Sequence, residues 1–149
     1  MEKGPGFVDP RHVKNDQYAQ DLADIQAQDV CPLCPDVFPG KWHTNPVLNT
    51  IGSWLITRNM HPYAGASEHF LLVGKEHKQE ISKLTAQDFF DILSLAQWAT
   101  AEFNLPGALL AMRFGDSKYT GATVTHIHAH LIVPEEVNGE IQVVNFPIG

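Results

Sequence analysis

Three histidines alternate with small or apolar residues in the segment His126-Ile127-His128-Ala129-His130. In a β-strand, successive side chains point to opposite faces, so this spacing would place the three imidazoles in one row. An imidazole can act as a nucleophile, acid, base or metal ligand near neutral pH. A polar strand edge or a nonspecific metal-binding tract is the plainer interpretation. We favour a reactive strand face, because other features of the chain point to the same site.

The two cysteines of the chain lie together in the segment Cys31-Pro32-Leu33-Cys34. A single Cys-x-x-Cys indicates metal or redox chemistry in a reducing compartment and argues against a disulfide framework. Taken alone, the pair fits a redox centre, a metal knuckle or two small buried residues. Pro32 and Pro35 place it in a loop, unlike the strand-to-helix entry of a thioredoxin-like site, and this favours a metal.

Size and composition are those of one globular domain. The chain has 149 residues, of which 44% are hydrophobic and 18% charged, and no apolar run approaches the roughly 20 residues of a membrane span. A net charge of −7 argues against a general nucleic-acid binder, although locally clustered cations could still hold a small anion. The first residues lack the apolar core of a signal peptide. We expect a cytoplasmic protein with no membrane partner and no stable nucleic-acid partner.

The N-terminal part of the chain is expected to be an arm followed by a short helix. Residues 1–13 contain several Gly and Pro residues, which break regular structure. Residues 14–29 are polar, with Tyr18, Leu22 and Ile25 spaced for a weakly amphipathic helix.

Turn residues divide the middle of the chain into a loop and a hairpin. Residues 31–46 are rich in Pro and therefore predict a loop. Residues 51–57 and 69–73 have strand composition, and a turn with Pro62 and Gly65 separates them. This pattern predicts a β-hairpin.

The clearest helix signal begins at Thr85, an N-cap residue with Asp88 three positions later, and ends before Pro106. After it, residues 108–114 and 124–133 have strand composition and flank a polar loop. Strands, then a helix, then strands, without βαβ alternation, predict an α+β domain with an antiparallel sheet and one main helix. One stripe of this helix consists of Phe89, Ile92, Leu93, Ala96, Thr100 and Phe103. Its large apolar members, Phe89, Ile92, Leu93 and Phe103, are expected in the core.

The triad segment resembles the signature of the histidine triad (HIT) family of nucleotide hydrolases and transferases. Residues 69–77, with a histidine at each end, resemble the family's other marked strand, and residues 59–63 resemble its ribose-binding turn. The resemblance implies an N-terminal arm with a short helix over residues 1–30 and a HIT domain over 31–149. The turn and the C-terminal residues are more similar to the branch of diadenosine polyphosphate phosphorylases and adenylyltransferases than to the phosphoramidase branch.

By this resemblance, His128 is the nucleophile that attacks an α-phosphorus and forms a nucleotidyl-histidine. His130 would donate to the phosphate oxygens, His69 would extend this row of donors, and Thr123 would approach the phosphate. Fixed donors aimed at developing charge are among the strongest devices for phosphoryl transfer. For His69 and Thr123 a structural role remains an equal alternative.

Four further residues match positions around the family's nucleotide pocket. Asn59 would bind the ribose, and Gly121 and Ala122 lie in the loop before the triad. Arg113 stands where relatives carry the Asn of an Asn-x-Gly, and an arginine can hold phosphate bidentately. Ala122 stands where many hydrolases carry a Gln that steers the leaving group. Candidate counter-charges for a polyphosphate are Arg113, Lys118 and Arg58, whereas Glu135 and Glu136 would repel one unless they face solvent.

The resemblance also implies two further metal ligands beside the Cys-x-x-Cys. Bacterial relatives bind zinc through such a pair and two histidines, which fall here on His77 and His126. The implied site, Cys31, Cys34, His77 and His126, is of the closed structural kind. The remaining histidines, His12, His43 and His61, fit no constellation and are expected at the surface or in turns.

The function we expect is cleavage of an α-phosphate linkage in a dinucleoside polyphosphate or nucleotide phosphoramidate. The alternative is a catalytically weak nucleotide-binding module with a structural zinc site, because Ala122 and Arg113 depart from the family pattern. A zinc scaffold or redox protein would rest on the Cys-x-x-Cys alone. The family also implies a homodimer, with Trp98 either at the subunit contact or over its own core.

Overall fold

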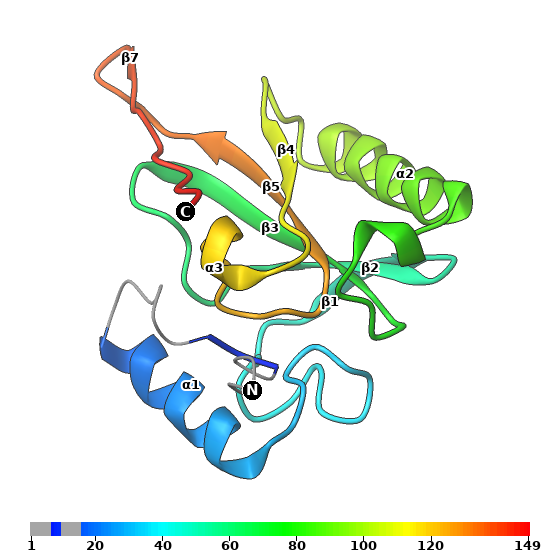
Figure 1. Cartoon of the computed structure of the whole chain (residues 1–149). Helices are drawn as coiled ribbons and strands as arrows, with labels where there is room; N and C mark the ends of the chain where they lie inside the picture. The colour runs from blue at the N-terminus through cyan, green and yellow to red at the C-terminus, as the bar shows by residue number, and fades with distance from the viewer. Residues whose placement is uncertain (1–6, 10–15) are drawn as a thin grey trace.

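The computed structural model, which describes residues 7–9 and 16–149, contains a five-stranded antiparallel sheet with helices on both faces (Figure 1). This confirms the predicted α+β class. The strand order is β1-β2-β3-β5-β4. The strands are β1 (Val47–Ile51), β2 (Trp54–Arg58), β3 (Ala66–Gly74), β4 (Leu109–Met112) and β5 (His128–Pro134).

The two faces of the sheet belong to two different cores. On one face, helix α2 (Ala86–Glu102) buries Leu95 against Leu72 and its neighbours. On the other face, helix α1 (Asp16–Gln28) and the cysteine loop contribute Leu22 and Leu33 to a second buried cluster that includes Leu71 of β3. Because side chains alternate along β3, adjacent residues serve opposite cores. None of the helices in the described part of the chain combines the length and apolar character that a membrane span requires.

Helix α2 begins where the sequence predicts, but its buried stripe is different. The Thr85 side chain accepts from the Asp88 backbone N–H and the Asp88 side chain accepts from the Thr85 N–H, which forms a capping box. Asp88 is buried because it also accepts from Trp54 Nε1 at 2.9 Å. Phe89 and Leu93, predicted to be core residues, are instead 50% and 52% exposed.

Two hairpins were not predicted. Strand β1 pairs with β2 through a turn at Gly52, whose φ of 57° favours glycine, and a Cβ there would lie 2.3 Å from Asp91 Oδ2. The second hairpin joins β6 (Glu136–Val137) to β7 (Glu140–Ile141). Its turn is Asn-Gly, the strongest short hairpin signal, so this hairpin could have been predicted from the sequence.

The segment before the triad departs most from expectation. Strand β5 begins at His128, so His126 lies before the strand and the three histidines do not form one row. A short helix, α3 (Ser117–Thr120), lies in the predicted polar loop, and a 3-10 turn, η2 (Ile81–Lys83), precedes α2 where no element was predicted. Within the predicted arm, residues 7–9 pair with residues 123–125 through a bridge between Val8 and Val124. The rest of that arm, including His12, lies outside the described residues.

Candidate active site and metal centre

His128 presents one ring nitrogen to a cavity and commits the other to the backbone. Its Nδ1 lies 2.8 Å from the carbonyl oxygen of His126, to which only a protonated nitrogen can donate. In the neutral ring this leaves Nε2 with its lone pair. Burial lowers the pKa of His128 below its usual value, and Arg113 adds to this effect. The geometry therefore gives a neutral imidazole with a free nucleophilic nitrogen.

His130 and His69 form a chain of hydrogen bonds behind the cavity. The Tyr63 backbone N–H donates to His69 Nδ1 at 3.1 Å, so neutral His69 carries its proton on Nε2. That proton can be donated to His130 Nδ1, 2.8 Å away, and His130 then keeps a proton on Nε2. Burial lowers the pKa of His69 to about 4 and that of His130 well below its usual value. His130 is thus fixed as a donor.

A cavity of about 550 Å³ lies beside these histidines. It is walled by α1, the cysteine loop, the β2–β3 turn, the loop before the triad and the C-terminal tail. The residues that line it include Tyr18, Asn59, Arg113, Thr123, His128 and His130. The cavity is large enough for a nucleotide-sized ligand.

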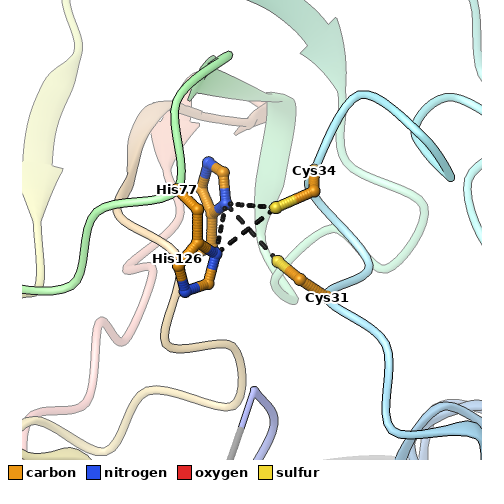
Figure 2. A group of neighbouring side chains, drawn as sticks. All are labelled: Cys31, Cys34, His77 and His126. Atoms are coloured by element: carbon orange, nitrogen blue, oxygen red, sulfur yellow. Dashed lines mark hydrogen bonds between the residues drawn. The ribbon is translucent and has the colours of Figure 1, made fainter.

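Two cysteines and two histidines point toward one another in a single cluster (Figure 2). Their ligand atoms all lie within 4.8 Å of one another. Cys31 Sγ is 3.4 Å from His126 Nδ1, Cys34 Sγ is 3.4 Å from His77 Nδ1, and the two Nδ1 atoms are 3.2 Å apart. A tetrahedral zinc ion with bonds of about 2.0 to 2.3 Å holds its ligand atoms about 3.3 to 3.8 Å apart. The residues present therefore fit a zinc ion.

A hydrogen bond to the backbone fixes the protonation of one ligand candidate, His126. His126 Nε2 lies 2.6 Å from the Gly74 carbonyl oxygen, to which it donates, so Nδ1 keeps its lone pair for a metal. Burial lowers the pKa of His126 to about 4 and raises the pKa of Cys31 to about 12. A thiol this reluctant to ionise needs a cation to become a thiolate, which is the form that binds metal.

The family follows from the sequence comparison. A model of the HIT domain matches residues 47–137, more than half of the chain. The chain belongs to the HIT family. None of the curated proteins compared with it matches in sequence.

Solved structures share the HIT fold. A HIT family hydrolase from Clostridium thermocellum Cth-393 is 22% identical, with a TM-score of 0.53 over 66% of this chain and 86% of that one. A histidine triad nucleotide-binding protein from Candida albicans is 20% identical, with a TM-score of 0.55 over 78% and 80% of the two chains. A histidine triad protein from Clostridium difficile is 18% identical, with a TM-score of 0.52 over 72% and 90%. At these identities the likeness shows the fold.

Within the HIT fold, most of the predicted site residues come together at the cavity. Asn59, Arg113, Gly121, Ala122 and Thr123 line it. The exception is His69, which is buried behind His130 and does not line the cavity. The Nε2 proton of His69 points to His130 Nδ1 and not to the cavity.

The contacts of Asn59 and Thr123 show what positions them. The Asn59 side-chain oxygen accepts from the His61 backbone N–H at 2.9 Å, and its nitrogen lies 3.3 Å from His69 Nε2. Thr123 Oγ1 shares a hydrogen bond of 2.8 Å with the Tyr18 hydroxyl. The first helix thus contacts the loop before the triad.

Sequence reasoning missed three residues of the cavity wall. His43, expected at the surface, is buried and donates from Nε2 to Thr57 Oγ1 at 2.8 Å, since that hydroxyl donates to the Pro46 carbonyl. His61 stacks on Tyr18 with ring centroids 4.6 Å apart. Tyr18 carried only a helical periodicity signal, which indicates a buried face and says nothing about its partner.

Proposed function

We propose that this HIT protein is a nucleotide hydrolase or nucleotidyltransferase that cleaves an α-phosphate linkage through a nucleotidyl-histidine on His128. The observation that carries the proposal is the neutral His128 ring, whose Nδ1–H is held by the His126 carbonyl while Nε2 remains free beside the cavity. A nucleophile that splits one difficult displacement into two easier ones is the usual gain of covalent catalysis.

In the first step, His128 Nε2 forms a bond to the α-phosphorus and the bond to the leaving group breaks. His130 Nε2–H stabilises the charge that grows on the phosphoryl oxygens, because the chain from Tyr63 through His69 fixes that proton in place. Water or inorganic phosphate then attacks the phosphorus and releases His128. The acceptor decides between a hydrolase and a phosphorylase of the branch that the sequence resembles.

The remaining predicted residues bind the nucleotide. We assign Asn59 to the ribose and Gly121, Ala122 and Thr123 to the wall beside the phosphate. The φ of 72° at Gly121 and the Gly149 carbonyl oxygen, which would lie 3.0 Å from a Cβ there, explain why glycine occupies this position. The ligand is a purine nucleotide or dinucleoside polyphosphate.

We also propose a structural zinc ion on Cys31, Cys34, His77 and His126. Such an ion would neutralise two thiolates and link the cysteine loop to the strand ends. His126 would then act as a ligand through its side chain and as the acceptor for His128 through its backbone.

The proposed function is tested by the products formed from diadenosine tetraphosphate, with and without inorganic phosphate. We expect AMP and ATP from a hydrolase, or ADP and ATP from a phosphorylase. His128→Gly should abolish turnover while its circular dichroism matches the wild type, and unchanged turnover would exclude this nucleophile.

Ala122 favours a second candidate, a nucleotide-binding module with weak chemistry. Its methyl group stands where many hydrolases place the Gln that steers the leaving group, and it lines the cavity. ADP would then raise the melting temperature of the wild type without any product appearing.

The homodimer implied by the family remains a proposal. Phe89, Phe90 and Leu93 form an exposed apolar face on α2, whereas Trp98 packs against Phe103 with ring centroids 5.7 Å apart. Trp98 thus covers its own core. Sedimentation equilibrium of the wild type and Phe90→Glu tests the dimer, and a monomeric wild type would exclude it.

A further inference from the structure

Arg113 is the one lysine or arginine among the described residues that line the cavity. The other candidate counter-charges are placed elsewhere. Arg58 Nε lies 2.9 Å from Glu68 Oε2, and Lys118 is exposed with Nζ over the Tyr119 ring. Glu135 and Glu136 are exposed and do not line the cavity. The charge that a bound phosphate would meet there is therefore that of Arg113.

The C-terminal tail holds the Arg113 side chain in place. Its guanidinium lies 4.1 Å from the centre of the Phe146 ring and donates through one NH₂ group to the Pro147 carbonyl. The same Phe146 ring lies 5.3 Å from the His130 ring, edge to face. The Phe146 ring thus contacts both the guanidinium and His130, the histidine that faces the phosphoryl group in the proposed mechanism.

The side chain of Arg113 still has hydrogen-bonding capacity. Its Nε is buried, and among the described residues it is the one buried side-chain nitrogen or oxygen without a hydrogen-bond partner. A buried donor without an acceptor is costly, and a phosphate oxygen is the acceptor that a guanidinium binds best. Arg113 also lowers the pKa of His69, His128 and His130, which places its charge within electrostatic reach of all three.

We propose that Arg113 determines specificity for the leaving group and selects substrates in which a phosphate, rather than an amine, leaves the α-phosphorus. This inference rests on the proposed function. When a dinucleoside polyphosphate reacts, the Nε2–P bond forms, the P–O bond breaks, and the electron pair departs on the leaving phosphate oxygen. That anion needs no proton, and a fixed guanidinium stabilises it directly.

A phosphoramidate makes a different demand. When its P–N bond breaks, the leaving amine must take up a proton, and arginine keeps its proton at any pH at which proteins are stable. Arg113 therefore favours a phosphate leaving group without assisting an amine. In both reactions water then attacks the nucleotidyl-histidine and forms a new P–O bond. The bond between phosphorus and His128 Nε2 breaks, its electron pair returns to Nε2, and a proton from the water goes to solvent.

The test compares kcat/KM for diadenosine tetraphosphate and adenosine 5′-phosphoramidate in the wild type and in Arg113→Gln. We expect Arg113→Gln to lose about 100-fold on the polyphosphate, the effect of removing one oxyanion donor, and less than about threefold on the phosphoramidate. Arg113→Lys, which keeps the charge but not the planar fork, should recover about tenfold of the loss. Lys83→Gln removes an equal charge from the exposed η2 turn and should change neither value.

Equal losses on both substrates, or none on either, would overturn the specificity role, whereas His128→Gly tests the proposed function separately. If the wild type turns over neither substrate, the proposed function fails and Arg113 is then tested by calorimetric binding of ATP and of adenosine. Arg113→Gln should weaken ATP binding about tenfold or more and leave adenosine binding unchanged. Equal ATP affinity in the two proteins would overturn the inference.

Discussion

Four histidines of this HIT domain differ in protonation because each has a different fixed neighbour. Backbone carbonyl oxygens accept hydrogen bonds from His128 Nδ1–H and from His126 Nε2–H, so these nitrogens are protonated. A backbone N–H donates to His69 Nδ1, so that nitrogen carries no proton. His130 receives its arrangement from His69. Backbone groups cannot change their donor or acceptor character, so they determine which nitrogen of each ring is free.

The buried His69 predicts a measurable pH dependence of stability. Its pKa in the folded protein is about 4, below the ordinary value of 6.5, because burial disfavours the charged ring. Its stabilising contribution is therefore complete above pH 6.5 and is lost as the pH falls from 6.5 to 4. The free energy of unfolding of the wild type falls as the pH is lowered over this range. In His69→Gln this fall should be smaller than in the wild type by roughly 2 to 3 kcal/mol.

Urea unfolding at several pH values between 7.5 and 4.5 measures this difference. Both proteins keep the four metal ligands, so their metal content, measured in parallel, serves as the control. Parallel stability curves for the wild type and His69→Gln would contradict the prediction.

At the scale of elements, α1 lies outside the matched HIT domain and yet forms a wall of its cavity. It begins at Asp16, whereas the family match begins at residue 47. Leu22 and Ile25 bury its apolar face, and Tyr18 at one end bonds to the loop before the triad. The helix is therefore positioned both by its apolar face and by one polar contact near the candidate active site.

The bond between Tyr18 and Thr123 predicts an energetic coupling between α1 and the triad loop. Tyr18→Phe removes one partner of a buried pair and should lower the free energy of unfolding by about 1 kcal/mol. A double-mutant cycle with Thr123→Val should give a coupling of about 1 kcal/mol, measured by urea denaturation. Strictly additive losses would show that the two hydroxyls do not stabilise each other.

At the scale of the whole molecule, the cluster of Cys31, Cys34, His77 and His126 joins three segments that are distant in sequence. The cysteine loop supplies two of its side chains, and the segment after β3 and the segment before β5 supply one each (Figure 2). The complete ligand set exists only after folding. A metal ion bound there would therefore stabilise the folded state and not the unfolded chain.

The proposed zinc ion therefore predicts a large change in thermal stability. Protein purified without chelator should contain about one zinc ion per chain, and its removal should lower the melting temperature by about 10 °C or more. Added zinc should restore the wild type but not Cys34→Ser. Elemental analysis and differential scanning calorimetry check this, and a melting temperature unaffected by chelation would contradict a structural role.

The sequence alone determined the features that depend on short-range chemistry. The start of α2 follows from a capping box within four residues, and the α+β class follows from the order of periodic segments. The Cys-x-x-Cys and the alternating histidines were visible as spacings. The resemblance of the histidine segment to the HIT family is confirmed by the match over residues 47–137, a range that does not include the cysteines.

Only the tertiary structure decided what surrounds each of these residues. His126 does not share a strand face with His128 and His130 and instead contacts Cys31. His69 lies behind His130, and Tyr18 contacts Thr123. The tertiary structure also exposed Phe89 while it buried Asp88, whose carboxylate accepts from Trp54 Nε1 and pairs with Lys78 Nζ. Such outcomes depend on contacts between segments far apart in the chain, and the spacing of residues along one segment carries no information about them.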